Sequence, residues 1–288
     1  MFILLTLPIV LCTGLSLASE AEALNLLKAI ENERMKYNCF HISYTEQRID
    51  DGGITIKQEV DFDHGKIRKF HLKTEHFPGW AEVLNGDEFY RYTFDEHEDV
   101  MLAASNSEEA KYTGIYDPRI LGLTDFPILP NTVKSCLLYG RLSGFTVEDT
   151  VLDGRKIKRV SINDNDEKKH WDIYITEPEF NLIKKVYSSS TINITITNKY
   201  DNPKLGPFPS EIKILRTDEG NTVFNRVINI TDFEEKKTFA PDTFSYKAMN
   251  LPINTAVIDY RIHQRLGYWD GEKLVEKPVS IRHRSCMK

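Results

Sequence analysis

Two small groups of titratable residues before residue 80 come closest to the spacing that a reactive site requires. His71 and His76 flank Glu75, and imidazole and carboxylate groups are common metal ligands. Alternation along a strand and the turns expected here would direct these side chains apart, so we predict no metal site. Asp61 and Asp63 share one strand face, but polar residues just before a turn are typically solvated. We therefore expect no acid–base pair.

Catalytic motifs and a nucleic-acid signature are both missing from the 288-residue sequence. It contains no Gly-x-Ser-x-Gly elbow, no His-Glu-x-x-His pair and no phosphate-binding glycine loop. The net charge of −6 disfavours a face that binds duplex nucleic acid. We expect a non-enzymatic protein without a cofactor, a metal or a nucleic-acid partner. A hydrolase would require clustered titratable residues, so apolar binding is the chemistry that remains.

The segment 170–188 is typical of the apolar strands that fill most of the chain. Trp171 and Ile173 share one side of an expected strand, and polar turn residues then lead into a second strand. Similar two-residue alternation, separated by Asp-Gly, Asn-Gly and Gly-Gly turns, recurs along residues 40–93 and 145–230. The pattern predicts a mainly β protein built from an antiparallel meander.

The beginning of the sequence has the composition of an export signal. Residues 1–19 carry no charged side chain, and residues 2–11 form an apolar run too short to span a bilayer. Small residues at Ser16 and Ala18 predict cleavage after Ala18. Residues 1–18 are therefore interpreted as a signal peptide, and the protein as periplasmic or secreted. No later run reaches the roughly 18 apolar residues of a membrane span.

The chain after this cleavage site would begin with a helix over residues 19–37. Ser19 and Glu22 form a capping box, and apolar residues then repeat at helical spacing. The chain after the helix is expected to continue as strands. At most one disulfide can form after cleavage, and the spacing identifies no pair among the three remaining cysteines, Cys39, Cys136 and Cys286.

Residues 114–139 interrupt the strand pattern. Apolar residues are dense here, including Leu123, Phe126, Leu129 and Leu138, while three prolines exclude one long helix. We expect short helices with two apolar sides. Such a segment can lie across a cavity as a lid or fill the core as a plug, and the sequence alone does not separate these roles.

A family resemblance appears in the first half of the meander. Residues 40–47 (Phe-His-Ile-Ser-Tyr-Thr-Glu-Gln) follow the helix, and residues 83–90 (Val-Leu-Asn-Gly-Asp-Glu-Phe-Tyr) form a later hairpin. This arrangement resembles the periplasmic lipoprotein carrier LolA and its relatives. The resemblance implies that residues 19–248 form an incomplete antiparallel β-barrel, a curved sheet with an N-terminal helix and short lid helices over residues 114–139. It also implies an apolar cavity that takes acyl chains.

The expected cavity is lined by one face of several strands and by the lid. The predicted lining residues are Phe62, Phe70, Phe89, Leu123, Phe126, Leu129, Leu138, Trp171 and Ile173. The family's carriers have a cavity arginine on an early strand that holds the lid shut. Lys66 and Arg68 are the nearest basic residues here and neither matches it, which leaves the release mechanism and a lipoprotein ligand open. We expect an exported protein that binds a lipid or an acylated protein.

Residues 249–288 extend beyond the part of the chain that the resemblance covers. Arg261, Arg265, Arg282 and Arg284 make this tail locally basic. We expect an added strand or packing arm on or beside the domain, or a segment that contacts an envelope protein. The alternative function is a non-enzymatic regulatory or structural module of the cell envelope that uses the same fold to bind a protein partner.

Overall fold

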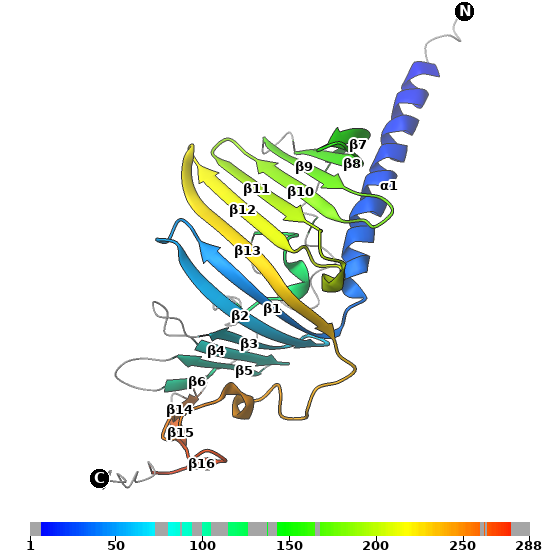
Figure 1. The fold of residues 1–288 in the computed structure, drawn as a ribbon. Coiled ribbons are helices and arrows are strands. Elements are labelled where there is room, and N and C mark those ends of the chain that lie inside the picture. Colours follow the sequence, from blue (N-terminus) through cyan, green and yellow to red (C-terminus); the bar gives the residue numbers. More distant parts are fainter. Residues whose placement is uncertain are drawn as a thin grey trace, which may run out of the picture.

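The computed structural model describes residues 7–72, 80–86, 88–93, 100–104, 115–125, 137, 143–164, 168–259, 262 and 264–277. These residues form one long helix and one sheet of sixteen strands, shown as a curved array of arrows in Figure 1. Helix α1 covers Leu7–Met35. The strands are β1 (Cys39–Arg48), β2 (Ile54–Asp63), β3 (Lys66–Leu72), β4 (Trp80–Asn85), β5 (Glu88–Thr93), β6 (Val100–Ala104), β7 (Ser143–Leu152), β8 (Arg155–Asp164), β9 (Lys169–Ile175), β10 (Leu182–Ser188), β11 (Ile192–Lys199), β12 (Glu211–Asp218), β13 (Asn221–Glu235), β14 (Ala256–Asp259), β15 (Gln264–Trp269) and β16 (Leu274–Val275). Short 3-10 helices are η1 (Pro118–Ile120), η3 (Pro203–Leu205) and η4 (Tyr246–Met249).

Two-residue alternation explains why these segments pair as strands. In β1, Phe40, Ile42 and Tyr44 are buried on one face, while the residues between them are more exposed. Tight turns join neighbouring strands. Asp153 and Gly154, between β7 and β8, both have positive φ angles, of 50° and 77°. An Asp-Gly pair favours this backbone in two-residue hairpins.

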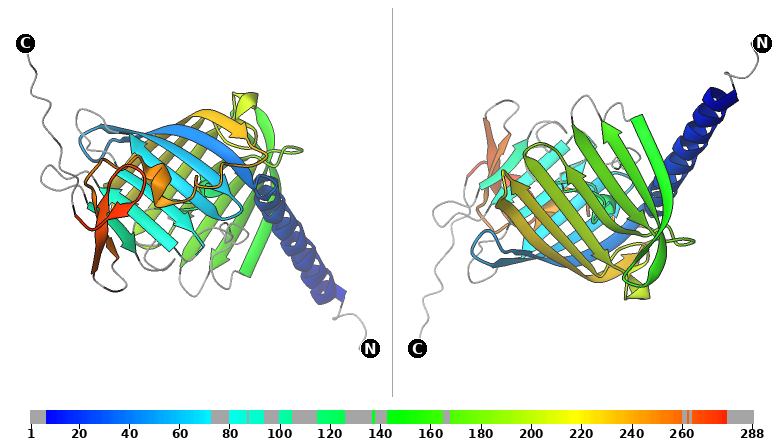
Figure 2. Two further views of the ribbon diagram at one scale, coloured as in Figure 1. Left: turned by 90° about the horizontal axis from the view of Figure 1, so that it is seen from below. Right: turned by 90° about the horizontal axis from the view of Figure 1, so that it is seen from above.

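Strand β1 joins two antiparallel meanders into one sheet. It pairs with β2 on one side and with β13 on the other, in the order β16-β15-β14-β6-β5-β4-β3-β2-β1-β13-β12-β11-β10-β9-β8-β7. Pairing along the described strands is antiparallel except between β6 and β14, which are parallel. Strands β16 and β7 are the two ends of this order, and Figure 2 shows that the sheet curves around an inner face without closing.

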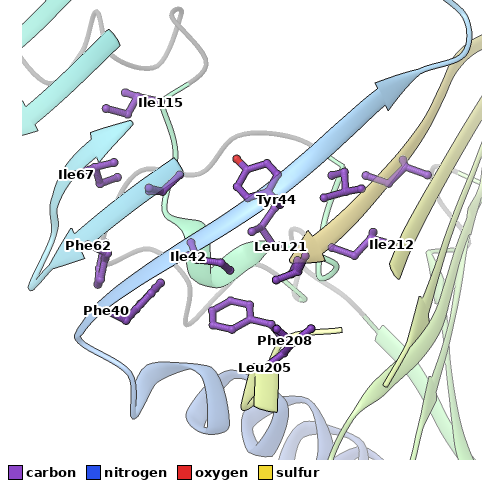
Figure 3. Packing of buried hydrophobic residues seen from close by; sticks show 14 of the residues in the cluster. Phe40, Ile42, Tyr44, Phe62, Ile67, Ile115, Leu121, Leu205, Phe208 and Ile212 are labelled. Carbon is purple, nitrogen blue, oxygen red and sulfur yellow. The ribbon is translucent and has the colours of Figure 1, made fainter. Parts of the chain in front are cut away.

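The inner face, defined as the side of the sheet that carries Phe40 and Ile42, holds two apolar clusters. The first cluster joins β1–β5 to β11–β13, and the rings of Phe40 and Phe62 lie 5.2 Å apart within it. Figure 3 shows its side chains converging from the strands and from the loop that carries Leu205 and Phe208. The second cluster packs helix α1 against β7–β10. The inner face is therefore the main core of the protein.

Helix α1 begins earlier than the sequence predicts. The expected helix covered residues 19–37, whereas the observed helix continues from Leu7 to Met35, through part of the segment interpreted as a signal peptide. Within the described residues, no helix combines the length and the apolar character needed to cross a membrane. The buried residues of α1 that pack on the second cluster repeat at helical spacing and are Ala23, Leu26, Leu27 and Ile30.

Residues 239–275 pack on the outer face of β3–β5 and extend the sheet. Strand β14 pairs with β6, and β15 and β16 continue the sheet beyond it. The described residues of this segment thus pack on β3–β5 and pair with β6. The buried members of this outer-face cluster are Ala81, Val83, Tyr92, Phe244, Met249, Leu251, Val257 and Trp269.

Candidate functional site

A row of side chains on the inner face of β9–β12 forms the wall of an open cavity. The strand register places Trp171, Tyr187, Ile194 and Arg216 side by side across four neighbouring strands. The cavity volume is about 290 Å³. This volume is near the lower end of the range of roughly 300–1,000 Å³ that is typical of ligand-binding pockets. The cavity is therefore large enough for one narrow ligand, such as a single hydrocarbon chain. The lining residues are Asp125, Lys169, Trp171, Lys185, Tyr187, Ile192, Ile194, Ile196 and Arg216.

The β-branched run on β11 supplies the apolar part of this wall. Ile192, Ile194 and Ile196 alternate with polar residues, so all three face inward. Ile196 is buried, but Ile194 is only partly buried at the edge of the first cluster. Packing within the described residues therefore leaves apolar surface open beside Trp171, and exposed apolar surface of this kind commonly marks a binding site.

Cationic side chains border the apolar wall. Lys185 is buried, and its Nζ donates a 3.2 Å hydrogen bond to the carbonyl oxygen of Leu123. Arg216 differs, because its Nε is shielded from solvent and has no hydrogen-bond acceptor among the described residues. A shielded donor without an acceptor costs about 1–3 kcal/mol. The cavity therefore has a donor that a ligand could satisfy.

A second cavity, of about 410 Å³, shares Asp125 with the first and is more polar. Its charged network centres on Glu46. This carboxylate accepts hydrogen bonds from Arg226 Nη1 at 2.6 Å, Gln58 Nε2 at 2.7 Å and Arg48 Nε at 3.1 Å. Glu46 is thus satisfied within the fold, and the remaining cations give the cavity a positive character. The lining residues that carry charge or an imidazole are Glu46, Arg48, Lys69, His71, Arg91, Asp125 and Arg226.

Positive charge around the second cavity affects its buried neighbours. Burial, together with Lys69, Arg48 and Arg91, holds the pKa of His71 far below its usual value, so His71 is neutral. The Nε2 atom of His71 lies 3.9 Å from Glu82 Oε2. Because His71 is neutral, this contact is not an ion pair. Burial raises the pKa of Glu82, although Lys69 and Arg91 oppose this shift. Lys69 and Arg91 therefore act on both His71 and Glu82 at this end of the inner face.

Residues 115–125 border the second cavity, Asp125 lines both cavities, and the segment is held by buried polar contacts. Asp117 and Arg119 form a fully buried ion pair, with 2.6 Å between Arg119 Nη2 and Asp117 Oδ2. The side-chain amide of Asn198 donates a 2.8 Å hydrogen bond to the carbonyl oxygen of Gly122. This part of the predicted insertion 114–139 is built into the core, while most of the rest lies outside the described residues.

The predicted cavity residues fall into separate groups. Leu123, Trp171 and Ile173 lie together in the cluster beneath α1, and Trp171 also borders the first cavity. Phe62 and Phe89 are enclosed in the other inner-face cluster. The structure thus brings three of these residues together near the cavity, and it places two inside the packed core.

The other predicted lining residues lie elsewhere. Phe70 is partly buried on the outer face, beside the C-terminal residues. Phe126, Leu129 and Leu138 lie outside the described residues. The sequence signal that could have located the observed wall is the alternation of isoleucines over residues 192–196.

A hydrogen-bonded chain on the outer face has the order of a hydrolase triad. His41 Nδ1 lies 2.8 Å from Asp61 Oδ1, and His41 Nε2 lies 3.0 Å from Ser43 Oγ. Arg68 Nε also donates to Asp61 Oδ2 at 2.6 Å. Asp61 is therefore buried and paired, and the expectation of a solvated carboxylate is wrong. Neither of the two cavities is lined by these residues.

The ionisation states of His41 and Asp61 favour a structural role for this hydrogen-bonded group of side chains. The hydrogen bond to Asp61 raises the pKa of His41, which favours the imidazolium that cannot act as a base. Burial alone would raise the pKa of Asp61, but hydrogen bonds and charge from His41 and Arg68 hold it below its usual value. The hydrogen-bonded side chains thus form an ion-paired network across β1, β2 and β3.

The candidate metal and disulfide residues are only partly within the described chain. In the described ranges, no cluster of three or more His, Cys, Asp or Glu side chains could hold a metal ion. Glu75 and His76 lie outside those ranges. Cys39 is buried with a free thiol, and Cys136 and Cys286 lie outside the described residues.

Comparison with solved structures places this architecture among known ones. A DUF1329 family protein from Desulfovibrio piger matches with a TM-score of 0.50 and 10% identity, covering 80% of this chain and 98% of that protein. A LolA superfamily protein from Nitrosomonas europaea matches with a TM-score of 0.47 and 11% identity, covering 78% and 98%. The fold is similar to that of the DUF1329 family protein. The predicted fold class, an open curved antiparallel sheet with an N-terminal helix, is confirmed.

Similarity at this level concerns the fold alone. The Pseudomonas aeruginosa MucA/MucB complex also matches, with a TM-score of 0.34, 11% identity, and coverage of 82% of this chain and 64% of that one. No family model and no curated protein matches the sequence.

Proposed function

We propose that this protein is an exported carrier that binds the acyl chain of a lipid, or of a lipidated protein, in the first cavity. The observation that supports the proposal is the open apolar wall of Ile192, Ile194 and Ile196 beside Trp171. Apolar surface on the inner side of a sheet would normally be covered by the protein's own side chains. Here a ligand chain would complete the packing.

The energetics favour a chain of modest length. Each methylene group removed from water contributes about 0.8 kcal/mol. About ten buried methylenes therefore supply roughly 8 kcal/mol, which corresponds to micromolar affinity before the cost of ordering the ligand is subtracted. A cavity of about 290 Å³ suits one such chain rather than two. No polar contact is needed for binding at this level.

Binding, and not catalysis, is the proposed role, and it would take place outside the cytoplasm. The predicted signal peptide, residues 1–18, would direct the protein to the periplasm or beyond it. Ser19 would then be the first residue, and its hydroxyl accepts a 3.1 Å hydrogen bond from the backbone N–H of Val147. Amino-terminal sequencing of protein recovered from the periplasmic fraction should read from Ser19. A chain that starts at Met1 would contradict processing at this site.

Binding can be tested with mature protein, purified from the periplasmic fraction and delipidated, and a fluorescent fatty acid. We expect saturable binding that weakens at least several-fold in Ile194→Gln, because the polar amide would face the chain. Leu215→Gln is the matched control, since Leu215 is 41% exposed on a neighbouring strand and faces outward. If neither a fatty acid nor a lipopeptide binds, the proposal is wrong.

A protein partner is the second candidate, and apolar exposure in the tail favours it. Ile253, Ile262 and Leu266 are 53%, 54% and 45% exposed. Deleting the tail would be a poor test, because it would uncover the outer-face cluster. The triple substitution of these residues by Ser leaves that cluster in place. Loss of a co-purifying envelope protein in this variant, with acyl-chain binding absent in the parent, would favour the second candidate.

A further inference from the structure

The two inner-face cavities have the opposite sign of charge from the whole chain. The sequence carries a net charge of −6, yet cationic side chains outnumber acidic ones around these cavities. The only acidic lining residues there, among the residues described, are Glu46 and Asp125. The cationic lining residues are Arg48, Lys69, Arg91, Lys169, Lys185, Arg216 and Arg226.

Arg216 is the cation placed best to meet a ligand in the first cavity. Its neighbours on the two adjacent strands are Ile194 and Phe224, so the side chain of Arg216 lies between apolar side chains. Its shielded Nε has no acceptor among the described residues. The Nε of Arg226 also has no acceptor among the described residues, but Arg226 Nη1 already donates to Glu46 at 2.6 Å. An arginine in an apolar wall with an unused donor favours an anionic acceptor from outside the protein.

We propose that the first cavity selects a single-chain amphiphile with an anionic head, a carboxylate or a phosphate, and that Arg216 binds this head. The inference rests on the proposed acyl-chain site and adds the chemistry of the head group. The planar guanidinium matches the oxygen pair of either anion. Lys169 on β9 and Lys185 on β10 also line this cavity and add positive charge. The chain lies along Ile192, Ile194 and Ile196.

Four ligands with the same dodecyl chain separate the head from the chain. Dodecanoate, dodecyl phosphate, dodecanol and dodecyltrimethylammonium are titrated by calorimetry into delipidated mature protein. The three charged ligands are kept below their micelle concentrations and dodecanol below its solubility limit. We expect both anions to bind at least about tenfold more tightly than dodecanol, because a hydrogen bond to a charged group contributes at this level. The cationic ligand should bind most weakly. The tighter anion identifies the source as a free fatty acid or a phosphate-bearing lipid.

Substitution at Arg216 then locates the head. Arg216→Met should weaken the binding of both anions about tenfold and change the binding of dodecanol less than about twofold. Arg216→Lys keeps the charge and should lose less, which provides a second variant if the methionine variant does not fold. Lys213→Met is the matched control on the outer face of the same strand, where Lys213 is 55% exposed, and it should change nothing.

The outcomes distinguish the two levels of the proposal. Equal affinity for dodecanol and both anions would overturn the anionic head and leave the acyl-chain site intact. Unchanged anion affinity in Arg216→Met would overturn the role of Arg216. Failure of all four ligands to bind would overturn both the proposed function and this inference.

Discussion

Asn198 is joined to Gly122 by a 2.8 Å hydrogen bond from its side-chain amide nitrogen to the glycine carbonyl oxygen. The same nitrogen donates to the carbonyl oxygen of Leu182 at 2.8 Å. One side chain on β11 thus holds residues 115–125 and β10 together beside the second cavity, which Gly122 lines. Gly122 has a φ of 79°, and a Cβ at this position would lie 2.7 Å from Asn198 Oδ1.

Gly122→Ala should be among the more destabilising single substitutions in this chain. The left-handed backbone costs roughly 1–2 kcal/mol for alanine, and the close approach to Asn198 adds a packing cost of about 1–3 kcal/mol. Gly154→Ala is the matched control, because Gly154 has a φ of 77° and open space around its Cα. Urea denaturation should show a larger loss for Gly122→Ala. Equal losses would mean that residues 115–125 shift easily.

Glu31→Gln should stabilise the protein above neutral pH. Burial raises the pKa of Glu31 from 4.5 to about 7, while the backbone N–H of Leu137 and nearby lysines oppose the shift. The folded state therefore holds this proton more tightly than the unfolded chain does. Its contribution to stability is complete below pH 4.5 and is lost as the pH rises through about 7. The loss is at most about 3 kcal/mol.

Melting temperatures of Glu31→Gln and the parent should coincide near pH 4 and diverge near pH 8, where the variant is more stable. Glu33→Gln is the control on the same helix, because Glu33 has a side-chain exposure of 39%. It should leave the pH dependence unchanged. If the parent protein instead became more stable relative to Glu31→Gln between pH 4.5 and 7, this assignment would be contradicted.

The pair of His41 and Asp61 should stabilise the protein more in mild acid than in base. The hydrogen bond that His41 donates to the Asp61 carboxylate raises the pKa of His41, so this contribution is complete below the unfolded value of about 6.5 and is lost as the pH rises through the folded value. His41→Ala should cost about 1–2 kcal/mol at pH 5 and less at pH 9. His64→Ala should cost little at either pH, because His64 has a side-chain exposure of 72% beside Asp63. A larger cost at pH 9 would sink the assignment.

Asp117→Ala should be more harmful than removing both partners of its ion pair. The single change leaves the buried guanidinium of Arg119 without its carboxylate, at a cost of about 3–5 kcal/mol. Asp117→Ala combined with Arg119→Met removes both charges and should recover part of that loss. Arg119 also donates to Asn38 Oδ1 at 2.9 Å, so recovery will be incomplete. Additive losses in denaturation would show that the pair is not coupled.

The strands and the Asp-Gly turns could be predicted because they depend on local alternation. The pairing of β1 with β13 could not, since it joins residues 40–48 to residues 226–235 and only the tertiary fold decides it. The presence of charged side chains on the inner face could not be predicted from the sequence either. Lys69 is 4% exposed and Glu82 is 0% exposed, although both polar residues alternate with apolar ones as outward-facing residues normally do.

Strand β4 shows the physical reason. Residues 81–84 are all buried, because the inner face meets the core and the outer face is covered by residues 244–269. When both faces of a strand are covered, the alternation of apolar and polar residues does not show which face is the inner one. Arg216 was missed for a similar reason, since its inward direction follows from the register of β12 with β11.

The cover over the outer face of β3–β5 comes from residues far later in the sequence than the strands it protects. Without residues 244–269, Ala81 and Val83 would be exposed on that side. A variant truncated near residue 240 would present this apolar patch to solvent, and exposed apolar patches promote aggregation. Docking of these later residues is thus also what protects the surface of the sheet from aggregation.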